Sequence, residues 1–444
     1  MRIPAPTAFF AAGCLLAAAT APPASSADHD ARPNVVLLII DTLRGDALGC
    51  AGIPDGTSPE IDALARRSLY FRRVVAPCTW TRPSVASMVT SLHPRTLGIY
   101  DLQSDQLADR FVTVAEVLKD NGYRTLGVTA NVNLSTRFNF HQGFDVYVDC
   151  GEVAPREEGE PFRVPTSPEI FGRVARETAA PGAGPWFVLI DVMDVHEYGE
   201  DASCPVPTGM EDLFAGSPDQ KYLRAVRQTS RAVGDFVRDL RGRPGWESTL
   251  FIVTSDHGEG LRSHPGVVDS YHHGRVLYES NAIVPWIVHS PDPARAPRRI
   301  DATVGLIDLA PTLLDLLGIA APPEMAGRSV LDGDSGDAAG EATYVTETHF
   351  QGDRKIGIYA PDWKLLVHRD WEPGQGKYQL ELQANERPED GRYTDRKADN
   401  PELVRELGKR LRSWESEHPE AEATQVEELD EELKEQLRAV GYVD

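Results

Sequence analysis

The sequence predicts an α/β fold in which a central, mostly parallel sheet lies between helices. Three runs are apolar at nearly every position, as are strands of a parallel sheet that is covered on both faces. They are Val35–Ile40, Trp186–Ile190 and Leu250–Thr254. Asp41 follows the first run, Asp194 and His196 follow the second, and Asp256 and His257 follow the third. Because such sheets bind ligands outside the carboxyl ends of their strands, we expect these side chains to meet at one metal centre.

Amphipathic stretches alternate with strand-like runs from residue 33 to about residue 330, which is typical of an α/β domain. Pro285 lies inside one of these runs and indicates an edge strand or an early position within the strand. Gly122 and Gly318 are expected to end two of the helices. The expected elements, in order, are a helix over Thr113–Asn121, strands over Arg124–Ala130 and Val284–Val288, and a helix over Ile307–Leu317.

Three segments are expected along the chain, with boundaries at residues 1–27, 28–335 and 336–444. Gly333–Gly340 is rich in Gly, Asp, Ser and Ala, which is typical of a boundary between domains. Beyond it we expect a smaller α+β subdomain with an acidic helical tail. Its expected elements are short strands over Thr343–Thr346 and Trp363–His368 and a helix over Pro401–Glu417.

Residues 1–27 predict an export signal, with Arg2 at the start, an apolar run over Ala8–Ala21 and small residues before Asp28. The expected location is periplasmic or extracellular, and lipid attachment at Cys14 is an alternative. No run has the length of a transmembrane helix. Removal of the signal leaves four cysteines, whose pairing the sequence does not decide. They are Cys50, Cys78, Cys150 and Cys204.

The formal net charge is −23, from 68 acidic and 45 basic residues, which argues against a nucleic-acid partner. Many of the acids lie between Glu415 and Glu435, so the charge says little about the active site.

Thr81 stands at the start of a predicted helix, because Pro83 fits the first turn. Its hydroxyl would then lie at the positive end of the helix dipole, where an anionic ester could bind. A cap of the helix is the simpler role for a threonine there. Arg82 either neutralises a bound anion or faces solvent. Asn131, at a strand end, is interpreted as a turn residue, with a hydrogen bond to an oxyanion as the alternative.

The chain resembles the sulfatase family of the alkaline phosphatase superfamily over nearly its whole length. The stretches that carry the resemblance are Asn34–Gly49, Ser58–Ala65, Thr254–Gly260, His273–Gly274 with Leu277–Glu279, Ile307–Thr312, Gly327–Ser329 and Gln436–Val443. The resemblance implies an alkaline phosphatase-like fold. It also implies a metal-dependent ester hydrolase.

The nucleophile position departs from the family pattern. Sulfatases carry Cys (or Ser)-x-Pro-Ser-Arg, and the first residue is oxidised to formylglycine. Alignment through the following helix places Thr81 at that position, and threonine cannot become formylglycine. Relatives with threonine there resemble phosphodiesterases, phosphonate hydrolases and phosphoethanolamine transferases. A second register keeps Cys78 and Arg82 but has Trp80 in place of the proline.

The resemblance assigns Asp41, Asp256 and His257 as metal ligands, together with Thr81. This oxygen and nitrogen set suits zinc or manganese. Calcium is an alternative, although calcium sulfatases have a second aspartate where this chain has Thr42. A second metal could be bound by Asp194, His196 and His273, with His264 or His272 nearby, which gives one or two ions in all.

The expected reaction is hydrolysis of a sulfate, phosphate or phosphonate ester by a metal-bound Thr81, assisted by His196 or His273. The expected substrate is a small-molecule, glycan or lipid ester. Three alternatives are a formylglycine sulfatase that uses Cys78, a phosphoalkyl transferase and an inactive binding scaffold. The oligomeric state stays open.

Overall fold

The structure is a computed structural model that describes residues 32–440, except 54–55, 101, 103, 156–161, 180–183, 199–213, 215–216, 218, 262–271, 293–294, 296, 332–341, 370–377, 386–393, 427–428 and 430. Residues Pro33–Asp444 form one compact unit. Several predicted features lie outside the described residues: the export signal, Cys14, Cys204, His264 and the boundary at Gly333–Gly340.

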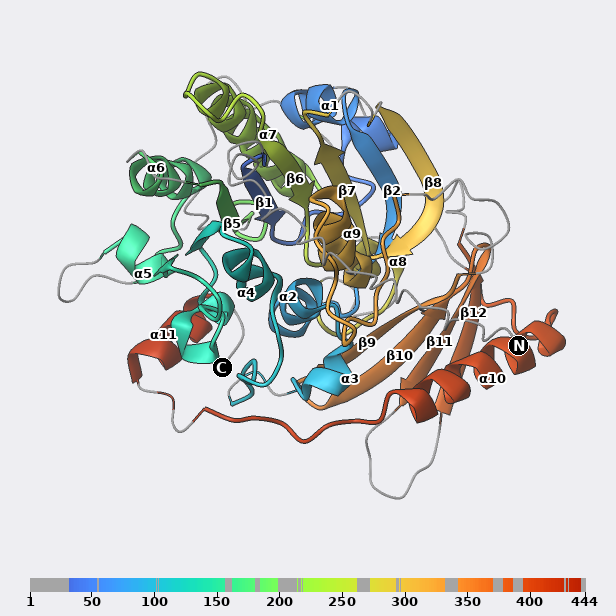
Figure 1. The fold of residues 1–444 in the computed structure, drawn as a ribbon. Coiled ribbons are helices and arrows are strands. Elements are labelled where there is room, and N and C mark those ends of the chain that lie inside the picture. Colours follow the sequence, from blue (N-terminus) through green and yellow to red (C-terminus); the bar gives the residue numbers. More distant parts are fainter. Residues whose placement is uncertain are drawn as a thin grey trace, which may run out of the picture. The chain divides into compact units, whose positions relative to one another are not determined.

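Eight strands form the large sheet, in the order β4-β3-β5-β1-β6-β7-β2-β8 (Figure 1). They are β1 (Val35–Ile40), β2 (Leu69–Val75), β3 (Arg124–Thr129), β4 (Val146–Val148), β5 (Trp186–Val192), β6 (Leu250–Thr254), β7 (Ile283–His289) and β8 (Arg298–Gly305). Only β7 runs antiparallel to its neighbours, β6 and β2. The predicted α/β fold with a mostly parallel sheet is therefore confirmed.

The register of the central strands brings the predicted ligands to one edge. Ile39, near the end of β1, pairs with Asp191 of β5 on one side and with Thr254 of β6 on the other. All six residues of β1 are buried, as the continuous apolar run predicts. Asp41 and Asp256 thus leave neighbouring strands at the same end of the sheet.

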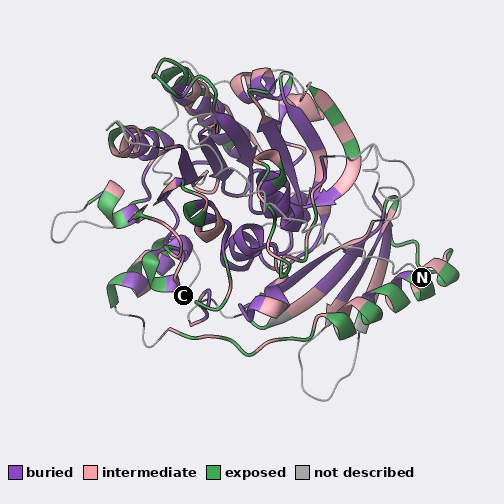
Figure 2. Ribbon diagram, viewed as in Figure 1, coloured by how far each residue is buried: buried purple, intermediate pink, exposed green. Residues whose placement is uncertain are grey.

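Helices cover both faces of this sheet, with α1, α6 and α7 in one layer and α2, α4 and α9 in the other (Figure 1). The helices are α1 (Pro59–Ala65), α2 (Thr81–Thr90), α3 (Pro94–Leu97), α4 (Val114–Asp120), α5 (Cys150–Val153), α6 (Ser167–Glu177), α7 (Gln220–Arg241), α8 (Glu279–Ala282), α9 (Leu309–Leu316), α10 (Pro401–Glu417) and α11 (Glu431–Ala439). Figure 2 shows the sheet as the buried centre, with exposed residues on the outer faces of the helices. Among the described helices, none has the length and apolar composition that crossing a bilayer requires.

The edge position that Pro285 indicated for its strand is wrong. β7 lies inside the sheet, between β6 and β2. The pairing of β2 with β7 shifts between Phe71 and Val74, so an irregularity in β2 lies opposite Pro285. A bulge in the partner strand removes the need for the amide hydrogen that proline lacks, and Pro285 is the third residue of its strand, which agrees with the early position.

A second, antiparallel sheet forms the C-terminal part, in the order β12-β11-β10-β9. Its strands are β9 (Tyr344–Phe350), β10 (Asp353–Tyr359), β11 (Trp363–Arg369) and β12 (Tyr378–Ala384). Leu407 and Leu411 of α10 pack against the apolar face of this sheet, which includes Ile358 and Leu365. The expected smaller α+β part is thus present, and the predicted helix over Pro401–Glu417 is confirmed.

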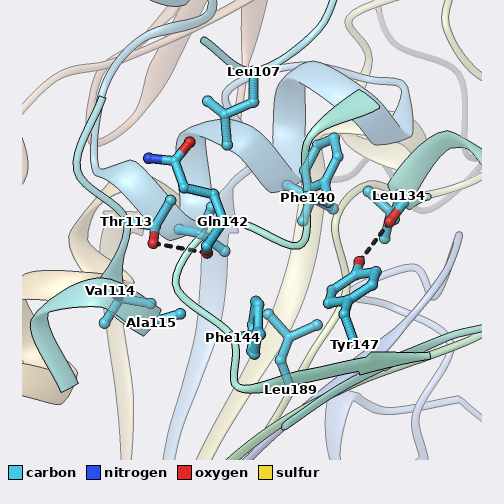
Figure 3. A pocket seen from close by; sticks show the side chains of 12 residues that line it. Leu107, Thr113, Val114, Ala115, Leu134, Phe140, Gln142, Phe144, Tyr147 and Leu189 are labelled. Carbon is cyan, nitrogen blue, oxygen red and sulfur yellow. Dashed lines mark hydrogen bonds between the residues drawn. The ribbon is translucent and has the colours of Figure 1, made fainter. Parts of the chain in front are cut away.

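A small apolar hollow lies in the core beside α2 (Figure 3). Val85 and Val89 of α2 form one wall, and Leu189 of β5 lies among the other lining residues. The hydroxyl groups of Thr113 and Tyr147 at its margin donate to backbone carbonyls. Apolar lining of this kind is core packing, so we assign no ligand to the hollow.

Candidate active site

Thr81 is the first residue of α2, and the cap position before it is occupied by Trp80. Thr81 Oγ1 lies 3.4 Å from Asp41 Oδ2 and 3.3 Å from His257 Nε2. Every residue of α2 is buried, and the Ser84 hydroxyl donates to the Asp256 carbonyl oxygen at 2.6 Å. This hydrogen bond joins the first turn of α2 to the loop after β6, so the start of the helix is held against the edge where the acidic side chains meet.

Asp41, Asp256 and His257 form a group whose potential ligand atoms all lie within 4.8 Å of one another. It is the one group of three or more such side chains found in the described part of the chain. His257 Nδ1 lies 2.9 Å from the Gly258 carbonyl oxygen, so Nδ1 carries the hydrogen and Nε2 has a lone pair for a metal.

The donor set fits a divalent cation. Asp41 Oδ1 and Asp256 Oδ2 are buried and accept no hydrogen bond from the described residues. Burial and the neighbouring Asp256 raise the pKa of Asp41 well above its usual value. Burial also raises the pKa of Asp256, and burial followed by the charge of His273 lowers the pKa of His257. Two buried carboxylates beside a neutral imidazole are a costly arrangement that a bound cation relieves.

Asn131 contacts two residues of the site, whereas the sequence was interpreted as placing it in a turn outside the site. Its Nδ2 donates to Asp41 Oδ2 at 2.6 Å and lies 3.4 Å from Thr81 Oγ1. Asp191 Oδ2 accepts hydrogen bonds from the Asn131 amide and the Thr129 hydroxyl, each at 3.0 Å. Asp191 therefore holds Asn131 in place from within the sheet. The available signal was the position of Asn131 at the end of a strand.

His196 and His273 lie beside the cluster in a row with His257. The ring centres of His196 and His273 are 5.1 Å apart, and those of His273 and His257 are 4.8 Å apart. His273 Nδ1 lies 3.1 Å from Glu259 Oε2, and His196 Nδ1 lies 2.9 Å from Glu197 Oε1. The carboxylates orient the two rings in the way that second partners orient catalytic histidines.

The carboxylates also affect the charge of His196. Burial lowers the pKa of His196, but the hydrogen bond to Glu197 and the charge of Asp41 outweigh it and raise that pKa to about 9. Sequence analysis missed the roles of Glu197 and Glu259. Glu197 directly follows His196, and Glu259 lies two residues after His257. Glu259 is 2% exposed, which an unpaired glutamate rarely is.

Asp194 does not join the predicted second metal centre. Its carboxylate accepts hydrogen bonds from the amide and the hydroxyl of Ser167, the first residue of α6. A carboxylate at a helix start satisfies free amide groups, which is a structural role. Of the other histidines considered, His272 is exposed. Ring contacts join His196 to His273 and His273 to His257 of the first cluster.

Cys78 lies against the C-terminal sheet and is not part of the group of potential ligands formed by Asp41, Asp256 and His257. It forms an isolated bridge with Glu347 of β9, and its thiol is free, as are those of Cys50 and Cys150. Burial raises the pKa of the Cys78 thiol, which opposes formation of a nucleophilic thiolate.

The expectation that Arg82 faces solvent is wrong, because its guanidinium is buried. It donates to the carbonyl oxygens of Leu102 and Asp105 and to Asn133 Oδ1, at 2.8, 2.9 and 2.9 Å. Its Cζ lies 3.4 Å from the ring centre of Phe138. The side chain joins the start of α2 to the segment that carries Asn131.

The family model described as Sulfatase matches residues 33–319, which is more than half of the chain. The chain belongs to the sulfatase family. A second family model, described as N-sulphoglucosamine sulphohydrolase, C-terminal, matches residues 269–416. The sulfatase match thus contains Thr81 and the whole cluster described above, and the second match contains the C-terminal sheet.

Individual relatives agree with this placement. The ulvan-active sulfatase of Formosa agariphila is 24% identical over 338 residues, which are 68% of this chain and 65% of that protein. The iduronate 2-sulfatase of Mus musculus is 34% identical over an alignment that covers 65% of this chain and 69% of that protein. The phosphonate monoester hydrolase of Agrobacterium radiobacter shares the fold, with a TM-score of 0.68, 18% identity and coverage of 87% of this chain and 96% of that one.

Proposed function

We propose that this sulfatase-family protein hydrolyses esters of sulfate, phosphate or phosphonate with Thr81 as its nucleophile. The observation that carries the proposal is the position of Thr81 Oγ1, which lies 3.3 to 3.4 Å from His257, Asp41 and Asn131. A buried hydroxyl at this point can serve as a fourth ligand of a cation held by Asp41, Asp256 and His257.

These four residues would hold the metal, and an oxygen and nitrogen set of this kind favours zinc or manganese, with calcium as the alternative. A bound divalent cation would balance the two carboxylates and lower the pKa of the Thr81 hydroxyl. The helix α2 has ten residues and begins at Thr81, so its free amide groups favour an anionic ester there.

The side chains then divide the reaction between them. The ionised Thr81 oxygen forms a bond to sulfur or phosphorus while the bond to the leaving oxygen breaks, and Asn131 Nδ2 is placed to donate to a developing oxyanion. His273 or His196 gives its proton to the leaving oxygen. Water then attacks the sulfur or phosphorus of the Thr81 ester, the bond to the Thr81 oxygen breaks, a proton from the water restores the Thr81 hydroxyl, and the sulfate, phosphate or phosphonate leaves.

The proposed substrate is a small-molecule or glycan ester. The relatives named above include proteins named for ulvan and for iduronate, which supports a sugar ester. We further propose that residues 1–27 direct export, which would bring the protein to extracellular glycans.

The formylglycine alternative at Cys78 has less support. The Cys78 side chain is buried, its backbone pairs with Glu347 of β9, and its thiol is not among the grouped ligands Asp41, Asp256 and His257. Conversion at Cys78 would therefore place the aldehyde beside the C-terminal sheet.

The test compares aryl sulfate, aryl phosphodiester and aryl phosphonate hydrolysis by the metal-loaded wild type and by Thr81→Ala. Ser87→Ala is a matched control, because Ser87 lies in the same helix and its buried hydroxyl has no hydrogen-bond partner in the described structure. We expect Thr81→Ala to lose at least about a thousandfold in kcat and Ser87→Ala to keep wild-type rates. Full activity of Thr81→Ala would contradict the proposal.

A further inference from the structure

Strand β9 of the C-terminal sheet is hydrogen-bonded to the segment that leads into α2. The amide of Glu347 donates to the carbonyl oxygen of Pro77 at 2.9 Å, and Cys78 pairs with Glu347 as a parallel bridge. The backbone three residues before Thr81 is therefore fixed by a strand more than 250 positions later in the chain.

Gly274 joins the same region to the histidine beside it, His273. Its amide donates to the carbonyl oxygen of Thr79 at 2.7 Å. Gly274 has φ +85°, and a Cβ there would lie 2.6 Å from a ring carbon of Phe350. Both the backbone conformation and the close approach require glycine at this position. The segment that carries His273 thus passes in contact with the end of β9.

The hydroxyl of Thr348, on β9, contacts the second of these segments. It donates to the carbonyl oxygen of Gly274, and Thr348 is 1% exposed. The preceding residue of β9, Glu347, donates its amide to Pro77 and pairs with Cys78, so Thr348 follows directly on the contact with the segment before Thr81. Two adjacent residues of β9 therefore contact the segment before Thr81 and the residue after His273.

We propose that Thr348 is a positioning residue that fixes His273 relative to Thr81 through the Gly274 carbonyl. The inference rests on the proposed function, since it assumes that His273 gives its proton to the leaving oxygen. Glu259 fixes the ring of His273 at Nδ1. The backbone of His273 is fixed by the hydrogen bonds of Gly274 to Thr79 and Thr348. Loss of the Thr348 hydroxyl lets the backbone move while the Glu259 contact stays.

A displaced proton donor affects esters according to their leaving group. A poor leaving group needs the proton as the bond breaks, whereas 4-nitrophenolate leaves without it. Displacement of His273 therefore slows phenyl ester hydrolysis and spares 4-nitrophenyl ester hydrolysis. General destabilisation of the fold, or damage to Thr81, would slow both esters to the same degree.

The experiment uses the full-length, metal-loaded protein and three variants, Thr348→Val, Thr348→Ser and Thr346→Val. Thr346 is the matched control, because it lies two residues earlier on the same face of β9, is fully buried, and has a hydroxyl without a partner in the described structure. The measured quantities are kcat and KM for the phenyl and 4-nitrophenyl esters of the acid that the wild type hydrolyses. Deuterium exchange of a peptide containing Gly274 is measured in parallel.

We expect Thr348→Val to lower kcat for the phenyl ester about tenfold, with KM and the 4-nitrophenyl rate within about threefold of wild type. Thr348→Ser keeps the hydroxyl and should restore the phenyl ester rate, and Thr346→Val should match wild type. The Gly274 peptide should exchange faster in Thr348→Val alone. Equal slowing of both esters, or unchanged exchange in Thr348→Val, would overturn the inference.

The two proposals fail separately. If the wild type hydrolyses none of these esters, the proposed function fails, and the exchange measurement still decides whether Thr348 holds Gly274. If Thr348→Val does not fold, the comparison of Thr348→Ser with Thr348→Ala gives the same test, because both remove the methyl group and only Ser keeps the hydroxyl. Equal phenyl ester rates in that pair would overturn the inference.

Discussion

Replacement of Arg82 by methionine tests whether this arginine supports the site or binds the substrate. The change keeps an unbranched, apolar side chain of similar length and removes the guanidinium. Three acceptors then lose their donor: the carbonyl oxygens of Leu102 and Asp105 and the Asn133 side-chain oxygen. Each buried acceptor left without a partner costs about 1–3 kcal/mol, so the low end of the range gives a loss of about 3 kcal/mol.

The assay is urea unfolding of Arg82→Met beside wild type, with Arg231→Met as the control. Arg231 lies on α7 and is exposed, so its replacement should cost less than about 0.5 kcal/mol. Arg82→Lys should lose less than Arg82→Met, because one ammonium group reaches fewer of the three acceptors than the guanidinium fork.

Kinetics separate the two roles of Arg82. Asn133 Oδ1 accepts from Arg82, and the Asn133 amide donates to Asn131 Oδ1 at 2.8 Å, so the support reaches the site through Asn131. We therefore expect Arg82→Met to lower kcat more than it raises KM. A variant as stable as wild type with a raised KM and an unchanged kcat would refute this reasoning and return Arg82 to substrate binding.

Three further predictions concern the C-terminal contact, the metal and pH. Glu347→Gln breaks the buried ion pair with Arg95, whose Nε lies 3.0 Å from Glu347 Oε2, and should cost about 3–5 kcal/mol in the free energy of unfolding measured in urea. Chelation of the metal should lower Tm. Zinc or manganese at a hundredfold excess over its Kd should then raise the free energy of unfolding by about 2.7 kcal/mol. A Tm that changes with neither chelator nor metal would argue against the site. Hydrogen bonds from Arg163 lower the pKa of Glu169 to about 2; burial opposes this shift, and hydrogen bonds from Thr166 add to it. The contribution of Glu169 to the free energy of unfolding is therefore complete above pH 4.5 and is lost as the pH falls toward 2. The stability difference between wild type and Glu169→Gln, measured by urea unfolding, should therefore shrink from pH 6 to pH 3, and a constant difference would count against this assignment.

The sequence predicted the parts of the site that depend on strand order. Asp41 and Asp256 each follow an apolar run, and the carboxyl ends of parallel strands meet at one edge, so their proximity could be expected without a structure. Pro83 marked the start of a helix at Thr81, but the local pattern favoured a cap there. The resemblance to sulfatases, and not the local pattern, assigned Thr81 to the nucleophile position.

Contacts between distant segments were beyond that reasoning. The hydrogen bond from Asn131 to Asp41 joins residues 90 positions apart, and the strand-end position of Asn131 fits a turn residue as well as a residue of the site. Arg82 lies in the first turn of a helix as expected, but this position does not determine which way the side chain points. The carbonyl groups that accept hydrogen bonds from its guanidinium belong to another segment. Asp194 has the residue type and strand-end position of a ligand, yet the start of α6 takes its carboxylate.

The mass of the peptide that contains residue 81, after rapid quenching during turnover of a slow ester, tests the central claim most directly. The account predicts a sulfo or phosphonyl group bound to Thr81 in wild type and absent from Thr81→Ala, with the Cys78 side chain unmodified. An adduct or a formylglycine at residue 78, with Thr81 unmodified, would contradict it.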